Sequence, residues 1–104
     1  MSPAKFDKAV KIVQNMPKDG PVKPTQDQQL AFYKYYKQGT NGDVNTERPG
    51  MLDFTGKAKW DAWNSVKGVS KEDAQNEYVK SLLEILRPSD SEDAKKWIAE
   101  IETA

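Results

Sequence analysis

Apolar residues recur every three or four positions in five segments of the chain, a spacing that places them on one face of a helix. Ser2 and Pro3 are suited to be the N-cap and the first residue of the first helix, which Pro17 ends. The apolar stripe of this helix is Phe6, Ala9, Val10, Ile12, Val13 and Met16. The first helix is therefore predicted between Pro3 and Pro17.

The second and third helices carry most of the aromatic residues. Thr25, followed three residues later by a glutamine, forms a capping box, so the second helix is expected over about residues 25–38. The third helix is expected over about residues 55–66. Trp60 and Trp63 share one of its faces because they are three positions apart, and at least one of them is expected in the core.

The last two helices are also delimited by their caps. Ser70 is the expected N-cap of a fourth helix, which Pro88 ends. Its apolar face is Ala74, Tyr78, Val79, Leu82, Ile85 and Leu86. Residues 89–92 are expected to cap a short fifth helix with the apolar face Ala94, Trp97, Ile98 and Ile101. Since so short a helix is marginal on its own in water, we expect it to dock on the others through Trp97.

Residues 39–53 form the longest stretch without a helical period, and glycine, asparagine, aspartate and proline are frequent there. We expect an ordered loop, because a long loop in a compact domain is usually either functional or disordered. Met51, Leu52 and Phe54, at its end, are expected to pin it against the helices. Helices with short connections elsewhere and no convincing strand predict an all-α bundle.

The charge of the chain is balanced overall but unevenly distributed. At 104 residues with no net charge, the chain is expected to be one domain and not a general nucleic-acid binder. Residues 1–37 hold seven lysines against three aspartates, whereas residues 70–104 hold five basic and nine acidic side chains. The basic front half could receive an anion. Alternatively, the two halves simply attract each other in the fold.

Several residue types are missing, and their absence excludes classes of chemistry. Without cysteine there is no disulfide, thiolate nucleophile or thiolate metal site, and without histidine there is no imidazole catalysis or histidine-based zinc site. No run of apolar residues approaches a membrane span, and the N-terminal segment lacks the apolar region of a secretory leader. These features predict a soluble, cytoplasmic protein.

The second helix carries the candidate binding residues. Tyr33, Tyr36 and Lys37 share one face, and Leu30 lies one turn earlier on the same side. Phenol rings and an ammonium group suit a ligand with an aromatic base and phosphates. Lys59 is a second candidate phosphate contact. The alternative is an ordinary surface helix with half-buried tyrosines and lysines lying along its surface.

Three runs of sequence resemble the signature of the acyl-CoA-binding protein family. They are residues 33–38, with the Tyr-x-x-Tyr-Lys motif, residues 42–54, which end in Glu-Arg-Pro-Gly-Met-Leu-Asp-Phe, and residues 56–64, with Lys-Trp-Asp-Ala-Trp. Residues 68–78 continue the resemblance. Some thirty positions agree in order and spacing over about residues 2–87, so the match is far more specific than one short motif.

The resemblance implies a four-helix bundle of up-down-down-up topology, in which the long second connection crosses over. It implies binding of long-chain acyl-CoA esters without their conversion, so no catalytic residue, metal or cofactor is expected. Residues 1–88 would form the acyl-CoA-binding domain. Residues 89–104 lie outside the family core and would be a C-terminal helical extension packed on or near the bundle.

The resemblance also implies which residues hold the ligand. Tyr33 would contact the ligand, while Tyr36 and Lys37 would meet its adenine, ribose and phosphate end. Lys59 would reach the region of the 3′-phosphate, and Tyr78 would line the adenine site. The whole expected set is Tyr33, Lys34, Tyr36, Lys37, Lys59 and Tyr78, with secondary contacts from Gln14, Lys23, Leu30 and Thr55.

Two of these positions depart from the family pattern. Gln14 aligns with a lysine that is common in the family, and Thr55 aligns with a position that is often basic. Both changes remove a positive charge, so the attraction of the ligand's phosphates should be weaker and less sensitive to salt.

The resemblance implies an intracellular carrier and pool former for acyl-CoA, expected to be a monomer that exchanges ligand with enzymes that produce and consume it. No nucleic-acid partner and no stable membrane insertion are expected. One alternative is a helical protein-interaction module that uses the tyrosine face and the helix of Trp97. A second is a thioesterase, but Asp43 and Asp61 have no evident partner that would make either of them a catalytic base.

Overall fold

The computed structural model describes residues 3–17 and 20–104, and all regular structure within them is helical. The helices are α1 (Pro3–Asn15), α2 (Gln26–Thr40), α3 (Phe54–Asn64), α4 (Lys71–Leu86) and α5 (Glu92–Glu102). The predicted all-α class is confirmed, and the predicted helices agree to within about two residues at most ends. Ser2, the expected N-cap of α1, lies outside the described residues.

Short-range hydrogen bonds at the N-caps explain where the helices begin. The Thr25 hydroxyl accepts from the Gln28 backbone N–H at 3.1 Å, and the Gln28 side chain accepts from the Thr25 N–H at 2.7 Å, so the capping box is present. Ser70 and Ser91 cap α4 and α5, each through a hydroxyl that accepts from the backbone N–H three residues later, without the reciprocal side-chain bond. Asp53 caps α3, which starts one residue earlier than predicted.

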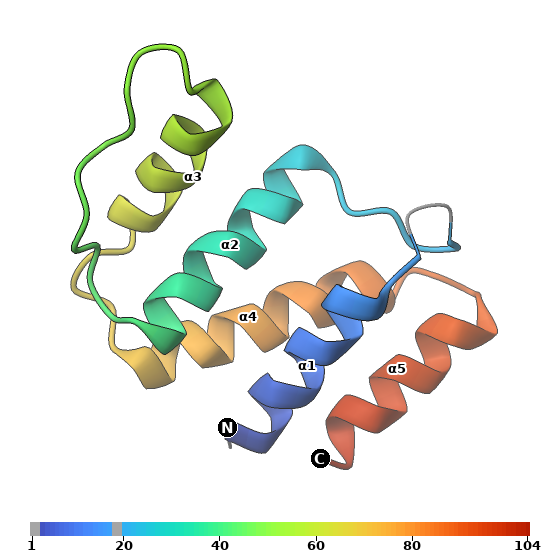
Figure 1. Ribbon diagram of the computed structural model, residues 1–104. Helices are drawn as coiled ribbons and strands as arrows, with labels where there is room; N and C mark the ends of the chain where they lie inside the picture. The colour runs from blue at the N-terminus through green and yellow to red at the C-terminus, as the bar shows by residue number, and fades with distance from the viewer. Residues whose placement is uncertain (1–2, 18–19) are drawn as a thin grey trace.

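α4 is the central helix of the bundle. It packs against α1, α2 and α5, and its Val79, Leu82 and Leu86 are fully buried. α2 packs against both α4 and α3. Figure 1 shows α2 and α3 running in the same direction, opposite to α1 and α4, which is the predicted up-down-down-up arrangement.

None of the helices in the described part of the chain has the length and apolar character that a membrane span requires.

The fifth helix docks on α1 and α4, as expected (Figure 1). Ala94 and Ile101 are its most deeply buried side chains, while Trp97 is half-buried against the same core. The Lys5 ammonium of α1 donates to the backbone carbonyls of Ile101 and Glu102 at 3.0 and 2.8 Å. This lysine satisfies carbonyls that the end of α5 would otherwise leave unpaired and complements the helix dipole.

Because α2 and α3 run in parallel, the segment 41–53 between them must return along the length of α3. An 11-residue helix is about 17 Å long, and this segment could span about 45 Å if fully extended. Figure 1 shows it passing along α3 to the far end of that helix. We call this segment the crossover loop.

The crossover loop is fastened to α3 by the two tryptophans of that helix. The indole N–H of Trp63 donates to the Gly42 carbonyl and that of Trp60 to the Thr46 carbonyl, both at 2.9 Å. Trp63 is buried and Trp60 is half-buried, which confirms that at least one of them belongs to the core. Both indoles therefore pair their polar group with loop backbone while their rings pack.

Two carboxylates fasten the same loop electrostatically. The Arg48 guanidinium donates to both oxygens of Asp61 at 2.9 Å, a bidentate pair that lowers the pKa of Asp61. Asp43 accepts from the Gly68 backbone N–H and from the Gln38 amide, both at 2.8 Å. These hydrogen bonds, that of Gly68 most strongly, lower the pKa of Asp43.

The expected apolar anchoring of this loop is wrong. Met51, Leu52 and Phe54 remain 81%, 90% and 73% exposed. The loop is held instead by the indole N–H groups and by charged side chains, and the segment that carries these three residues projects beyond the packed helices (Figure 1).

Replacing Asp43 by alanine should lower the midpoint of thermal unfolding by a few degrees at neutral pH, because two hydrogen bonds between the loop and the bundle are lost. The folded-state pKa of Asp43 lies below its ordinary value of 3.8, so its contribution is present above that pH and disappears as the pH falls through the folded pKa. The difference between the variant and the parent protein should therefore shrink in acid. Melting curves over a pH series, with Asp90→Ala as the control, measure it; a difference that is constant with pH would contradict this role.

Candidate ligand-binding site

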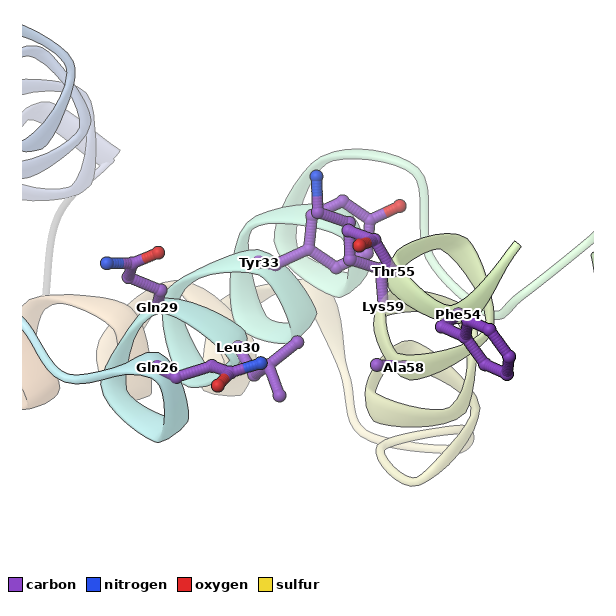
Figure 2. A pocket seen from close by; sticks show the side chains of 8 residues that line it. All are labelled: Gln26, Gln29, Leu30, Tyr33, Phe54, Thr55, Ala58 and Lys59. Carbon is purple, nitrogen blue, oxygen red and sulfur yellow. The ribbon is translucent and has the colours of Figure 1, made fainter. Parts of the chain in front are cut away.

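Three adjoining hollows lie along α2. The first, between α2 and α3, has a volume of about 220 Å³ and is shown in Figure 2. We call it the α2–α3 hollow. Its lining residues are Gln26, Gln29, Leu30, Tyr33, Phe54, Thr55, Ala58 and Lys59. Figure 2 shows Leu30 and Tyr33 of α2 on one side, facing α3 with Ala58 and Lys59 on the other.

The second hollow, between α1, α2 and α4, has a volume of about 330 Å³ and is lined by three tyrosines, so we call it the tyrosine hollow. Its lining residues are Val10, Gln14, Gln29, Phe32, Tyr33, Tyr36, Lys59 and Tyr78. The third, the α1–α2 hollow, measures about 540 Å³. It is lined by Val13, Gln14, Met16, Lys23, Pro24, Gln29 and Phe32.

The three hollows adjoin because they share walls, and we call the three together the trough. Gln29 lines all three. Tyr33 and Lys59 line both the α2–α3 hollow and the tyrosine hollow, and Gln14 lines the tyrosine hollow and the α1–α2 hollow. The Lys59 ammonium lies 5.5 Å from the centre of the Tyr33 ring, so a cation and a phenol meet where the first two hollows join.

Two of the three tyrosines of the trough pack against a buried aromatic residue of α1. Phe6 packs edge-on against Tyr78, with ring centres 5.3 Å apart, and in a stacked arrangement against Tyr36 at 6.4 Å. Tyr78 is 3% exposed, whereas Tyr36 is 38% exposed and presents its ring to the solvent side. Phe6 of α1 therefore packs against two of the rings that line the tyrosine hollow, one from α2 and one from α4.

Tyr78 carries a hydroxyl that the protein leaves available. Burial, with a smaller contribution from Tyr36, raises the pKa of Tyr78 far above the ordinary value of a phenol, so it remains neutral and can donate a hydrogen bond. Its hydroxyl makes no hydrogen bond to the described residues, and the side chain lines the tyrosine hollow. A ligand acceptor in this hollow would give the hydroxyl its partner.

The structure brings together eight of the ten residues that the sequence singled out. Tyr33, Tyr36, Lys59, Tyr78, Gln14, Lys23, Leu30 and Thr55 all line the trough. Lys34 and Lys37 do not line any of the three hollows. The Lys34 ammonium lies 5.0 Å from the centre of the Tyr35 ring, and that of Lys37 lies 4.9 Å from the Trp63 ring.

The sequence interpretation missed Gln29, although this residue lines all three hollows of the trough. Its side-chain amide donates to the Pro24 carbonyl at 3.2 Å, at the start of α2. The spacing could have indicated it, since Gln29 stands four positions before Tyr33 on the same helix face. Val10 was likewise assigned only to the apolar stripe, yet it stands four positions before Gln14 and lines the tyrosine hollow.

These features define a small helical binding module in which a hollow with partly apolar walls adjoins one lined by three tyrosines, with a lysine at their junction. The model of the family described as "Acyl CoA binding protein" matches residues 3–82, so this chain belongs to the acyl-CoA-binding protein family.

Individual relatives agree with this assignment. The crystal structure of ACBP from Moniliophthora perniciosa is 70% identical, covers 100% of this chain and 98% of its own, and superposes with a TM-score of 0.98. Acyl-CoA-binding protein homolog 3 of Caenorhabditis elegans is 41% identical over 99 residues, which are 94% of this chain and 85% of that protein. Acyl-CoA-binding domain-containing protein 5A of Danio rerio is 50% identical over 82 residues, but this chain spans only 16% of its length.

Replacing Tyr78 by phenylalanine should leave the free energy of unfolding unchanged or raise it by up to about 1 kcal/mol, because the hydroxyl has no partner in the protein. Replacing Tyr78 by alanine should cost about 3–5 kcal/mol, since it opens a cavity beside Phe6. Urea denaturation measures both, with Tyr36→Phe as an exposed control. A large loss of stability in Tyr78→Phe would show that the hydroxyl serves the fold rather than the hollow.

Proposed function

We propose that this chain binds long-chain acyl-CoA esters in the trough and acts as an intracellular carrier and pool former. The observation that carries the proposal is the junction of two unlike hollows at Tyr33 and Lys59. An acyl-CoA ester has the same two parts: a nucleotide with phosphates and a long hydrocarbon chain, joined by a polar linker.

The nucleotide end is assigned to the tyrosine hollow. Tyr33 and Tyr36 offer ring surface on which adenine can stack, and Tyr78 offers a hydrogen-bond donor at the floor. Lys59 is the cation that reaches this hollow, so it is assigned to a phosphate. Each such contact contributes about 1–3 kcal/mol when partly desolvated.

The acyl chain is assigned to the α2–α3 hollow, where Leu30, Ala58 and Phe54 provide apolar walls. Taking a palmitoyl chain out of water gains about 0.8 kcal/mol per methylene, which is on the order of 10 kcal/mol before the entropic costs of association. The chain therefore supplies most of the affinity. The head-group contacts decide that the ligand is a CoA ester rather than a free fatty acid.

The two uncharged residues that stand where the family pattern often has a basic one both line the trough. Gln14 lines the tyrosine hollow and Thr55 the α2–α3 hollow, so each removes a positive charge from beside the proposed ligand. Lys34 and Lys37 stay in the proposed binding set, because a lysine stem is flexible and the cation–π contact that each would give up contributes only about 0.5–2 kcal/mol. With fewer fixed cations, the binding constant should depend only weakly on salt.

We propose a carrier without catalytic turnover. Asp43 and Asp61, the carboxylates considered as bases, are engaged in the hydrogen bonds that fasten the crossover loop.

Residues 1–88 are proposed as the binding domain and residues 89–104 as a docked extension. We further propose a cytoplasmic monomer that exchanges its ligand with enzymes that produce or consume acyl-CoA.

Titration calorimetry with palmitoyl-CoA, CoA and palmitate tests the proposed function. Only palmitoyl-CoA should bind tightly, because only it fills both hollows. Equal binding of palmitate would point to a fatty-acid carrier, and no binding of any of the three would overturn the proposal. Release of free thiol during incubation would reveal a thioesterase instead.

Replacing Lys59 by alanine should weaken binding by about 1–3 kcal/mol, by a similar increment for every acyl chain length, because it removes a contact to the head group. Calorimetry across a series of acyl-CoA esters measures this, with Lys80→Ala on the exposed face of α4 as the charge-matched control. A loss that grows with chain length would mean that Lys59 contacts the acyl chain rather than a phosphate.

Replacing Tyr78 by phenylalanine should weaken acyl-CoA binding severalfold, although the variant folds as stably as the parent protein. The reason is that the hydroxyl donates only to the ligand. Calorimetry with palmitoyl-CoA measures the effect. Unaltered affinity would remove Tyr78 from the set of polar contacts and leave it a packing residue.

A further inference from the structure

The first helix presents one face to α5 and another to the trough. On the first face, the Lys5 ammonium donates to two backbone carbonyls at the end of α5, and Ile12 lines a hollow between the two helices. On the second, Val10 and Gln14 line the tyrosine hollow, and Phe6 packs against two of its tyrosines. Both faces belong to one helix of 13 residues, so a shift of α1 that alters its contacts with α5 also moves a wall of the trough.

α5 takes no direct part in the trough. None of the residues of α5, all of which the structure describes, lines any of the three hollows. Its buried Ala94 and Ile101 belong instead to the same core cluster as Phe6 and Ala9 of α1. The family match ends at residue 82, before α5 begins, so the role of this helix does not follow from the match. Any influence of α5 on a ligand must therefore pass through the helices on which it docks.

α1 depends on its neighbours, because a helix of 13 residues is marginal in water by itself. It packs against α4 and α5, and Figure 1 shows α5 beside it. The hydrogen bonds from Lys5, at 3.0 and 2.8 Å, join the first turn of α1 to the last turn of α5. The next residue along α1 is Phe6, which packs against both Tyr36 and Tyr78. The attachment of α5 is thus one residue away from the side chain that supports two rings of the tyrosine hollow.

We propose that docking of α5 holds α1 in place, and that this docking and the binding of a ligand in the trough stabilise each other. Lys5 is a positioning residue in this coupling, because it acts through Phe6 and the rest of α1 and not on the ligand. When α5 undocks, α1 is free to shift, and the wall that Val10 and Gln14 provide is no longer preformed. The proposal rests on the proposed function for the identity of the ligand and adds a means by which α5 regulates that site.

Thermodynamic linkage provides a test that a merely structural role of α5 would not pass. If docking of α5 raises the affinity for a ligand, the ligand must favour docking by the same factor. Saturating palmitoyl-CoA should therefore slow amide hydrogen exchange in α5 about fivefold, although this helix lies outside the trough. The measurement is made by mass spectrometry on the parent protein and on Lys5→Met. In Lys5→Met, α5 opens locally more often, so its exchange reports docking rather than global unfolding.

Variants at the contact between α1 and α5 give the second measurement. Lys5→Met should speed exchange in α5 about tenfold, because two hydrogen bonds at its end are lost. Adding Ile101→Ser, which places a hydroxyl in the core, should undock α5 and weaken palmitoyl-CoA binding about fivefold in calorimetry. The loss should be the same for every acyl chain length, since α1 does not line the α2–α3 hollow.

Two controls separate positioning from charge. Lys11→Met removes the same charge from the exposed side of the same helix, so it should leave both exchange in α5 and affinity unchanged. Lys5→Arg keeps a cation that can donate to the two carbonyls, so it should behave like the parent protein. A loss of affinity in Lys11→Met as large as that in the Lys5 and Ile101 double variant would show that charge and not docking sets the affinity, and would overturn the proposal.

The proposal is also overturned if palmitoyl-CoA protects α2 but leaves exchange in α5 unchanged, or if the double variant binds palmitoyl-CoA as tightly as the parent does. Should the double variant not fold, the effect of the ligand on α5 in Lys5→Met decides alone, because that variant keeps every core side chain. A parent protein that does not bind palmitoyl-CoA would reject the proposed function and the coupling with it. A parent that binds it without protecting α5 would reject only the coupling.

Discussion

The site depends on the attachment of the crossover loop to α3. The indoles of Trp60 and Trp63 hold the loop backbone, and the bidentate pair of Arg48 and Asp61 adds to this attachment. With the loop fixed along α3, α2 and α3 lie side by side in the same direction. This arrangement opens the α2–α3 hollow, because the side chains of α3 that face α2 are small or flexible, as Ala58 and Lys59 are.

The remainder of the bundle gives this hollow a rigid neighbour. α4 fills the centre with Val79, Leu82 and Leu86, and Phe6 of α1 fixes the rings of Tyr36 and Tyr78. Because these aromatic rings are already fixed, little conformational entropy is lost in ordering the site when a ligand binds. In such a site, burial of apolar area supplies most of the free energy of binding, and a few fixed polar groups supply selectivity.

The fold and most of the site could be predicted from residue order alone. The capping box at Thr25 and the serine N-caps are set by neighbours three residues apart, so they are local properties of the chain. The apolar stripe of α4 indicated its core face for the same reason. Tyr33 and Lys59 were candidate ligand contacts from their positions in the sequence, whereas Tyr78 was added by the resemblance to a family, which supplies pairings between helices that periodicity cannot.

The tertiary structure decided what depends on distant contacts. Lys37 shares a face of α2 with Tyr33, yet it lies over the Trp63 ring of α3, because its environment is set by which helix packs alongside. Gln29 became the common wall of three hollows through the placement of α1 and α3 around α2. Met51 and Leu52 were expected to be buried from hydrophobicity alone, but the loop that carries them projects past the bundle. The sequence by itself determined where helices begin and which faces they bury, since those are short-range properties. The surfaces that meet, and therefore the shape of the trough, follow only from the packing of helices far apart in the chain.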